Sequence, residues 1–150
     1  MCIRDSVTIT VEEETTPGAC AGDYVITRTF TATDDCGNAT SATQTITIID
    51  TTAPTFVLVP GDYTAECSDA HPMEMAAAVD NCGTVVVTVD EETTFGLCAG
   101  DYVITRTFTA TDDCGNATSA TQTITIVDTT APVLTIPTDY TAECSRSPNG

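Results

Sequence analysis

The sequence has no lysine and no tryptophan, and it contains a single histidine, His71. Its four basic residues, all arginine, stand against 22 acidic residues, which gives a formal net charge of -18. General base catalysis most often uses histidine or a lysine with a shifted pKa, and nucleic-acid binding needs a basic surface. The composition therefore argues against an enzyme and against a nucleic-acid-binding protein.

Long apolar runs and CxxC metal motifs are also missing, so the sequence predicts no membrane span and no thiolate metal centre. No signal peptide precedes the first predicted strand, and we expect the exporting signal to lie outside this sequence. The chain nevertheless has eight cysteines. Cysteines at this density indicate disulfides and an oxidising compartment. We therefore predict an extracellular location, at the cell surface or in a secreted fibre.

An exact internal repeat dominates the sequence. The segment CAGDYVITRTFTATDDCGNATSATQTITI occurs at 20–48 and again, unchanged, at 98–126, a spacing of 98 − 20 = 78 residues. The flanking motifs DTTAP and DYTAEC also occur twice. The sequence thus predicts tandem repeats of about 78 residues. We divide the chain into the rear part of one repeat (1–50, with 1–5 atypical), a complete repeat (51–128), and the first strand of a further repeat (129–150, with 146–150 atypical).

Hydrophobic residues in the complete repeat alternate with a period of two. Ile104 and Phe108 share one face of a predicted strand, and threonines occupy the other face. Similar strands flank this one, preceded by a long strand over 56–67 and a weaker one over 73–79. This pattern predicts an all-β fold of tandem immunoglobulin-like antiparallel β-sandwich repeats, reinforced by disulfides.

Two polar residues, Arg106 and Gln122, fall on the inward face of consecutive strands. A buried guanidinium must find hydrogen-bond partners or reach solvent. We interpret the pair as a structural hydrogen-bond node that could include Glu66. A ligand-binding role is the alternative.

Alternating strand directions restrict the disulfide pairing of the complete repeat. Cys67 and Cys98 should lie at the end where the chain leaves the repeat, and Cys82 and Cys114 at the end where it enters. We therefore predict the pairs Cys67–Cys98 and Cys82–Cys114. Each bridge would close a loop of roughly 30 residues and contribute about 3 to 4 kcal/mol.

Several aspartates are expected near the end where the chain enters the repeat. Hard cations such as calcium take six to eight oxygen ligands, so a calcium site is one interpretation, whereas Asp and Asn are also common in tight turns. The candidate ligands are Asp50, Asp80, Asp112, Asp113 and Asp128. No other cofactor is predicted.

The frame DTTAP, PGDYT, VDNCG and TFTATDDCGN, closed by TITIVD, resembles the HYR (hyalin repeat) group of immunoglobulin-like domains. It is particularly similar to the cysteine-containing variants of long Bacteroidetes surface proteins. The resemblance implies an extracellular stalk, adhesin or filament with no catalytic residues. Arg28 and Arg106 depart from the family by standing where an apolar strand residue is common.

The same resemblance bears on glycosylation. Asp50-Thr51-Thr52 and its copy at 128–130 resemble the acceptor motif of Bacteroidetes O-glycosylation, which makes Thr51 and Thr129 candidate sites. A plain linker is the alternative interpretation of both motifs.

Three functions compete at this point. They are a head-to-tail filament or stalk built from copies of the chain, an adhesin-type module that binds a ligand such as a glycan, and non-catalytic repeats of a larger secreted enzyme. Near-identical repeats favour the filament, because a lattice needs equivalent joints. The partial repeats at the two ends allow two arrangements: a continuous polypeptide runs through them, or the last predicted strand of one subunit completes the first repeat of the next by strand addition. Strand addition would place Cys144 beside Cys20 of the neighbour.

Overall fold

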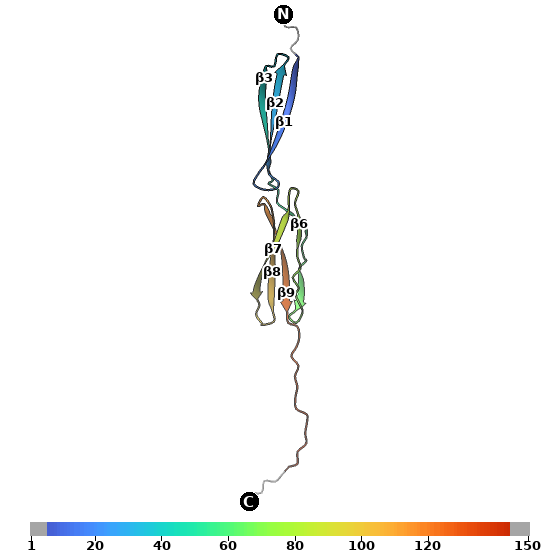
Figure 1. The fold of residues 1–150 in the computed structure, drawn as a ribbon. Helices are drawn as coiled ribbons and strands as arrows, with labels where there is room; N and C mark the ends of the chain where they lie inside the picture. The colour runs from blue at the N-terminus through green and yellow to red at the C-terminus, as the bar shows by residue number, and fades with distance from the viewer. Residues whose placement is uncertain (1–5, 145–150) are drawn as a thin grey trace.

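The computed structural model describes residues 6–144, and within this range the chain forms nine strands and no helix (Figure 1). The strands are β1 (Val7–Pro17), β2 (Tyr24–Asp34), β3 (Ala39–Ile48), β4 (Thr55–Leu58), β5 (Tyr63–Glu66), β6 (Ala77–Val79), β7 (Val85–Phe95), β8 (Tyr102–Asp112) and β9 (Ala117–Val127). They form a first unit, β1 to β3, and a second unit, β4 to β9, placed end to end (Figure 1). No helix that could span a membrane is found among residues 6–144.

The first unit is a single antiparallel sheet in the order β1-β2-β3. Its central strand pairs with both neighbours over almost its whole length, from Tyr24↔Ile48 to Thr33↔Ala39 on the β3 side. Strands β7, β8 and β9 repeat the arrangement, and the register Tyr102↔Ile126 to Thr111↔Ala117 is the same register shifted by 78 residues. The internal sequence repeat is therefore also a repeat of strand pairing.

The second unit adds three short strands to this motif. Its larger sheet has the order β5-β9-β8-β7, and β4 pairs with β6 in a separate two-stranded sheet. All pairs are antiparallel except β5 with β9, which run parallel from Tyr63↔Ile124 to Glu66↔Val127. The predicted all-β, disulfide-reinforced sandwich is confirmed, with one parallel pair that the sequence did not indicate.

The long strand predicted over 56–67 is wrong. The structure divides it into β4 and β5, which belong to different sheets. Residues 59–62 between them form no strand and include Pro60 and Gly61. Proline has no N–H to donate to a strand ladder and glycine weakens a strand, so the chain changes sheets at this point.

The predicted period of two is confirmed in β8 and β9. Phe108, Ile124 and Ile126 are almost fully buried, whereas the intervening threonines of both strands remain partly exposed. Tyr63 and Ala65 of β5 pack against this core. The core of the second unit is therefore built on the inward faces of β8 and β9, with β5 beside β9 in the same sheet.

The segment after β9 leaves the second unit at the end opposite the first unit (Figure 1). Residues 128–144 are extended and form no strand. We call residues 133–144 the terminal segment; its sequence VLTIPTDYTAEC resembles FVLVPGDYTAEC at 56–67, which includes β4 and β5. The apolar side chains of the terminal segment are exposed, including Leu134 and Tyr140.

Candidate functional site

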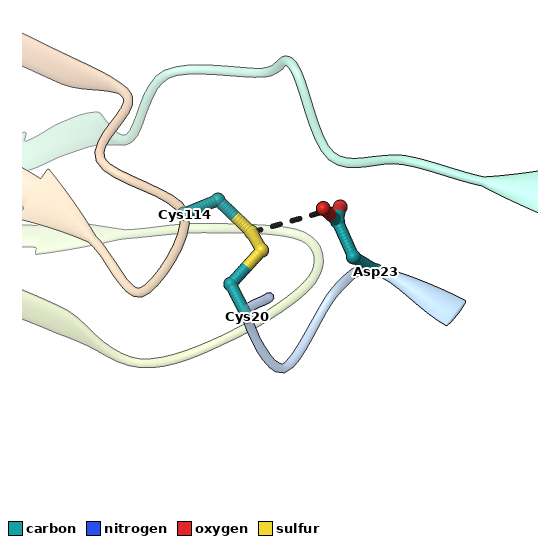
Figure 2. Close-up of side chains that lie close together, drawn as sticks. All are labelled: Cys20, Asp23 and Cys114. Atoms are coloured by element: carbon teal, nitrogen blue, oxygen red, sulfur yellow. Dashed lines mark hydrogen bonds between the residues drawn. A yellow bond between two sulfur atoms is a disulfide. The ribbon is translucent and has the colours of Figure 1, made fainter. Parts of the chain in front are cut away.

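A disulfide joins the two units (Figure 2). Cys20 lies in the turn between β1 and β2, and Cys114 lies in the turn between β8 and β9, 94 residues later. Their Cα atoms are 5.0 Å apart, within the usual range for a disulfide. Asp23 points toward the bridge, with its Oδ1 atom 3.9 Å from Sγ of Cys114. We call this region, together with the linker 50–54, the junction.

The junction is closely packed around Gly22. A Cβ atom on Gly22 would lie 2.8 Å from Cβ of Asp50 and 3.1 Å from Cβ of Cys82. No side chain fits there without a shift of the surrounding backbone. Each unit also forms a hydrogen bond with the backbone of the linker residue Asp50. Its N–H donates to the Asp23 carboxylate of the first unit (2.9 Å), and its carbonyl accepts from the side-chain amide of Asn116 of the second unit (3.2 Å). Glycine thus allows the two units to touch.

This bridge differs from the predicted pairing. Cys114 is bonded to Cys20, so the Cys82–Cys114 bridge is not formed, and within the described part of the chain Cys67 and Cys98 are unbonded as well. For the complete repeat, only bridges inside that repeat were predicted, but the β1–β2 turn of the preceding unit reaches the end of the second unit where Cys114 lies. Cys20 is also not available to Cys144 of a neighbouring subunit, and Cys144 is unbonded and exposed.

Three of the five predicted calcium ligands gather beside the junction. Carboxylate oxygens of Asp50, Asp80 and Asp112 all lie within 4.8 Å of one another. Asp50 comes from the linker, Asp80 follows β6, and Asp112 ends β8. We call these three residues the junction aspartates. Three negative charges at this distance repel one another unless hydrogen bonds or a cation compensate them.

The junction aspartates are compensated to different degrees. Oδ1 of Asp112 accepts hydrogen bonds from the backbone N–H groups of Cys114 and Asn116, and its Oδ2 accepts one from the Asn116 side chain. Burial raises the pKa of Asp112, but these hydrogen bonds outweigh burial and hold its pKa below the usual value. Oδ1 of Asp80, by contrast, is buried and has no hydrogen-bond partner among the residues that the structure describes. The cluster therefore holds an ionised carboxylate and an unpaired carboxylate oxygen.

The negative field of the cluster also acts on Cys82. Partial desolvation by neighbouring groups raises the pKa of this exposed thiol, and the charges of the three junction aspartates raise it further. Its backbone N–H donates to Oδ2 of Asp80 at 2.8 Å. Cys82 is therefore a protonated thiol at neutral pH.

The other two predicted calcium ligands do not join the cluster. Asp113 accepts hydrogen bonds from the backbone and hydroxyl of Thr84, which tie the start of β7 to the β8–β9 turn. Asp128 lies at the opposite end of the second unit, where its N–H donates to Asp101. Asp128 follows the second unit just as Asp50 follows the first. The two residues are therefore one whole unit apart and cannot bind the same ion.

Arg106 and Gln122 form the predicted hydrogen-bond node in the second unit. Arg106 is 2% exposed and donates to Glu91 (2.9 Å), to the carbonyl oxygens of Pro72 (2.9 Å) and His71 (3.3 Å), and to Gln122 (3.4 Å). The acidic partner is Glu91 of the neighbouring strand; Glu66, the partner predicted from the sequence, instead accepts hydrogen bonds from Thr129. Gln122 donates to the carbonyl of Gly61 at 2.9 Å.

The same side chains are uncovered in the first unit. Phe30 is 37% exposed, whereas its copy Phe108 is fully buried. Arg28 retains the ion pair with Glu13 (2.7 Å), but the two side chains are 38% and 47% exposed. Gln44, the copy of Gln122, is exposed. We call this side of the β1–β3 sheet the open face.

The two candidate glycosylation sites lie in matched linkers but differ in their contacts. Thr51 is exposed. Thr129 is exposed too, but its hydroxyl donates a hydrogen bond to Glu66. Glycosylation of either threonine stays a prediction.

Residues 56–126 match the family described as an HYR-like domain with four cysteines. The matched range contains Cys67, Cys82, Cys98 and Cys114. It runs from the second residue of β4 to the penultimate residue of β9. The resemblance expected from the sequence is therefore confirmed for the hyalin-repeat domain.

A search of curated proteins finds hyalin of the sea urchin Lytechinus variegatus, which is 33% identical over 130 residues. The alignment covers 79% of this chain and 24% of the relative, so the chain spans about a quarter of the length of the curated protein it matches. This relative is an animal protein, and the predicted bacterial source stays a prediction. Hyalin-repeat domains are extracellular, non-catalytic modules of the adhesion type, and the predicted extracellular location is confirmed.

Proposed function

We propose that this chain, which carries an extracellular hyalin-repeat domain at residues 56–126, is a structural building block that associates head to tail with copies of itself. In this arrangement the terminal segment of one copy covers the open face of the next. The proposal favours a fibre or stalk over a module that recognises a separate ligand. One observation carries it: the same sheet is covered in the second unit and uncovered in the first.

The second unit shows what the cover consists of. The chain between β4 and β6 supplies the carbonyl oxygens of Gly61, His71 and Pro72 to Gln122 and Arg106. Tyr63 and Ala65 of β5 supply apolar contacts to the core. The terminal segment contains the same DYTAEC motif as β5, and its Tyr140 is 88% exposed. Burying such side chains on an apolar sheet contributes roughly 25 cal/mol per Å² of apolar surface.

The strand register predicts how the terminal segment would bind. Tyr63 pairs with Ile124 in the parallel β5–β9 ladder. The residue equivalent to Tyr63 in the terminal segment is Tyr140, and the residue equivalent to Ile124 in the first unit is Ile46. We therefore expect Tyr140 of one copy opposite Ile46 of the next, with the terminal segment running parallel to β3. The outer edge of β3 pairs with no other strand among residues 6–144, so it can accept this addition.

The first test removes the terminal segment. The chain ending at residue 132 is expected to stay monomeric at all concentrations, whereas the whole chain forms concentration-dependent multimers, measured by light scattering and negative-stain electron microscopy in a reducing buffer. Removal of residues 145–150 alone is the control and should leave assembly intact. A whole chain that is monomeric at high concentration would contradict the proposal.

A synthetic peptide provides an independent measurement. A labelled peptide of residues 133–144 should bind the chain that ends at residue 132, because that chain has the open face and no terminal segment of its own. The same peptide with Tyr140→Asp should bind much more weakly, since a charge would enter the apolar face. Equal binding of both peptides would show that the register above is wrong.

A second, compatible role is calcium binding at the junction aspartates. The buried, unpaired Oδ1 atom of Asp80 supports it, together with the approach of carboxylates from three separate segments. Calcium binds oxygen ligands of this type, and linkage of a cation across two units would stiffen the joint between them. The site would be completed by backbone oxygens or water.

Calcium should then raise the thermal stability of the chain after treatment with a chelator. At a calcium concentration 100 times the dissociation constant, the expected stabilisation is about 2.7 kcal/mol, or roughly 5 to 10 °C in the melting temperature. Asp80→Asn should abolish the increase, whereas Asp128→Asn, at the other end of the second unit, should not. A melting temperature that millimolar calcium leaves unchanged would exclude this role.

A further inference from the structure

The turn that carries Cys98 is a copy of the turn that carries Cys20. In the second unit the N–H of Gly96 donates to the carbonyl of Asp101 at 2.8 Å, and the N–H of Asp101 donates to the carbonyl of Cys98 at 3.1 Å. The equivalent bonds in the first unit are Gly18 to Asp23 at 2.8 Å and Asp23 to Cys20 at 3.1 Å. Both cysteines therefore project from the same local backbone.

The linkers beside these turns match as well. Asp128 donates its N–H to the Asp101 carboxylate at 3.0 Å, as Asp50 does to the Asp23 carboxylate at 2.9 Å. Gly100 allows the close approach of Asp128, because a Cβ atom there would lie 2.6 Å from Cβ of Asp128. The second unit thus ends in the same corner with which the first unit contacts its neighbour.

Cys36 lies in a turn that copies the turn of Cys114. Its N–H donates to Asp34 at 2.9 Å, and the same carboxylate accepts from the backbone and side chain of Asn38, both at 2.8 Å. Cys114 has the same bond to Asp112 at 2.9 Å. A glycine with positive φ follows each cysteine: φ is 84° at Gly37 and 87° at Gly115.

The equivalent turns differ in whether another cysteine lies opposite them. Cys20 and Cys114 meet at the junction and are bonded, whereas Cys98 and Cys36 are exposed and form no disulfide within residues 6–144. Cys98 lies at the end of the second unit from which the terminal segment leaves, and Cys36 lies in the β2–β3 turn at the far end of the first unit (Figure 1). These two cysteines therefore cannot meet within one chain.

We propose that Cys98 of one copy forms a disulfide with Cys36 of the next copy, as Cys20 does with Cys114 within the chain. This inference rests on the proposed head-to-tail association and names the covalent bond that would lock it. When the terminal segment covers the open face of the next copy, the second unit of one copy lies against the first unit of the next. This joint is equivalent to the joint between the first and second units within one chain. In the shifted linkage, Cys98 of the same copy takes the place of Cys20, and Cys36 of the next copy takes the place of Cys114.

The bond requires an oxidant, for which we name a low-molecular-weight disulfide of the glutathione class. The thiolate of Cys98 attacks one sulfur of this disulfide, forms a mixed disulfide and releases one thiol. The thiolate of Cys36 from the next copy then attacks Sγ of Cys98 and displaces the second thiol. The two protein thiols lose two electrons, which the small disulfide accepts, and an extracellular location favours this direction.

Cys67 is the competitor for Cys98. It follows β5 at the same end of the second unit and donates its N–H to the carbonyl of Val127 at 3.0 Å. A Cys67–Cys98 bridge is the pairing predicted from the sequence. It would be confined to one chain and would leave Cys36 without a partner. The two pairings therefore have different consequences for the size of the oxidised protein.

Unreduced peptide mapping distinguishes these pairings. The whole chain is oxidised with a mixture of oxidised and reduced glutathione and then cleaved before aspartates, which places Cys36 in peptide 35–49, Cys98 in 90–100 and Cys67 in 62–68. We expect a cross-link between 35–49 and 90–100, and mixing of isotopically light and heavy chains should show that it joins different copies. A cross-link between 62–68 and 90–100 in place of it would overturn the inference.

Serine variants give a second measurement. Non-reducing electrophoresis of the oxidised chain should show a ladder of covalent multimers. Cys36→Ser and Cys98→Ser should each reduce the ladder to the monomer band, and Cys67→Ser is the matched control that should retain it. A ladder that persists in Cys36→Ser would also overturn the inference.

Assembly in reducing buffer separates the two proposals. Multimers that form there without any Cys36–Cys98 cross-link after oxidation would leave the head-to-tail association standing and overturn only the disulfide. A chain that forms neither multimers nor a ladder would overturn both. Reducible ladders from a chain that also associates in reducing buffer would support both.

Discussion

Phe108→Ala is expected to destabilise the second unit by about 3 to 5 kcal/mol, while Phe30→Ala lowers the stability of the first unit by less than about 1 kcal/mol. Both residues occupy the same place in an identical 29-residue sequence. Phe108 is fully buried, so its loss leaves a cavity, whereas Phe30 is 37% exposed and has less contact to lose. Urea unfolding followed by circular dichroism, with hydrogen exchange to assign the loss to a unit, measures both effects.

Assembly changes the expectation for Phe30. When the terminal segment of another copy covers the open face, Phe30 is expected to lose part of its exposure to solvent. Phe30→Ala should then weaken multimers strongly while it barely affects the monomer. Equal destabilisation of both units in the monomer would show that the open face is covered within the single chain.

Arg106→Met is the second substitution with a large expected effect, a loss of about 2 to 4 kcal/mol in the stability of the second unit. The methionine fills much of the same space but donates no hydrogen bond, so the carbonyls of His71 and Pro72 lose their donor inside the protein. Glu91 is partly exposed and can be solvated, so the ion pair itself accounts for little of the loss.

Arg28→Met is the matched control. Among residues 6–144, Arg28 pairs only with Glu13, and both side chains are more than one third exposed. Exposed ion pairs of this kind contribute about 0 to 1 kcal/mol, so the stability of the monomer should change within that range. The melting temperatures of the two variants, measured in parallel, test the contrast. A loss for Arg106→Met as small as that for Arg28→Met would mean that the buried node adds little to stability.

Much of the second unit follows from its sequence because a period of two fixes the face on which each residue lies. Ile104 and Phe108 were expected inside, and so was the exceptional Arg106. The break between β4 and β5 was missed, although Pro60 and Gly61 are local signals for it. The parallel pairing of β5 with β9 depends on how distant segments pack, and no local pattern in the sequence indicates it.

The junction was predicted only in part. Convergence of Asp50, Asp80 and Asp112 follows from the order of the strands, and the structure brings them together. The Cys20–Cys114 bond was missed because each repeat was treated as a closed unit. Gly22 was an available signal: a glycine two residues after a cysteine, beside the linker, indicates a close approach of backbone.

The Cys20–Cys114 disulfide also determines how the chain would carry tension. A pull applied to the two ends would pass along the backbone to Cys20, across the sulfur atoms to Cys114 and onward through β9, and would bypass the linker between the units. The two cysteines are 94 residues apart in the sequence, and the chain between them could not be extended while the bond is intact. Fully extended, this segment would span about 310 to 340 Å. Reduction of this one disulfide would allow the segment to extend under force, so the junction carries mechanical load as well as joining the two units.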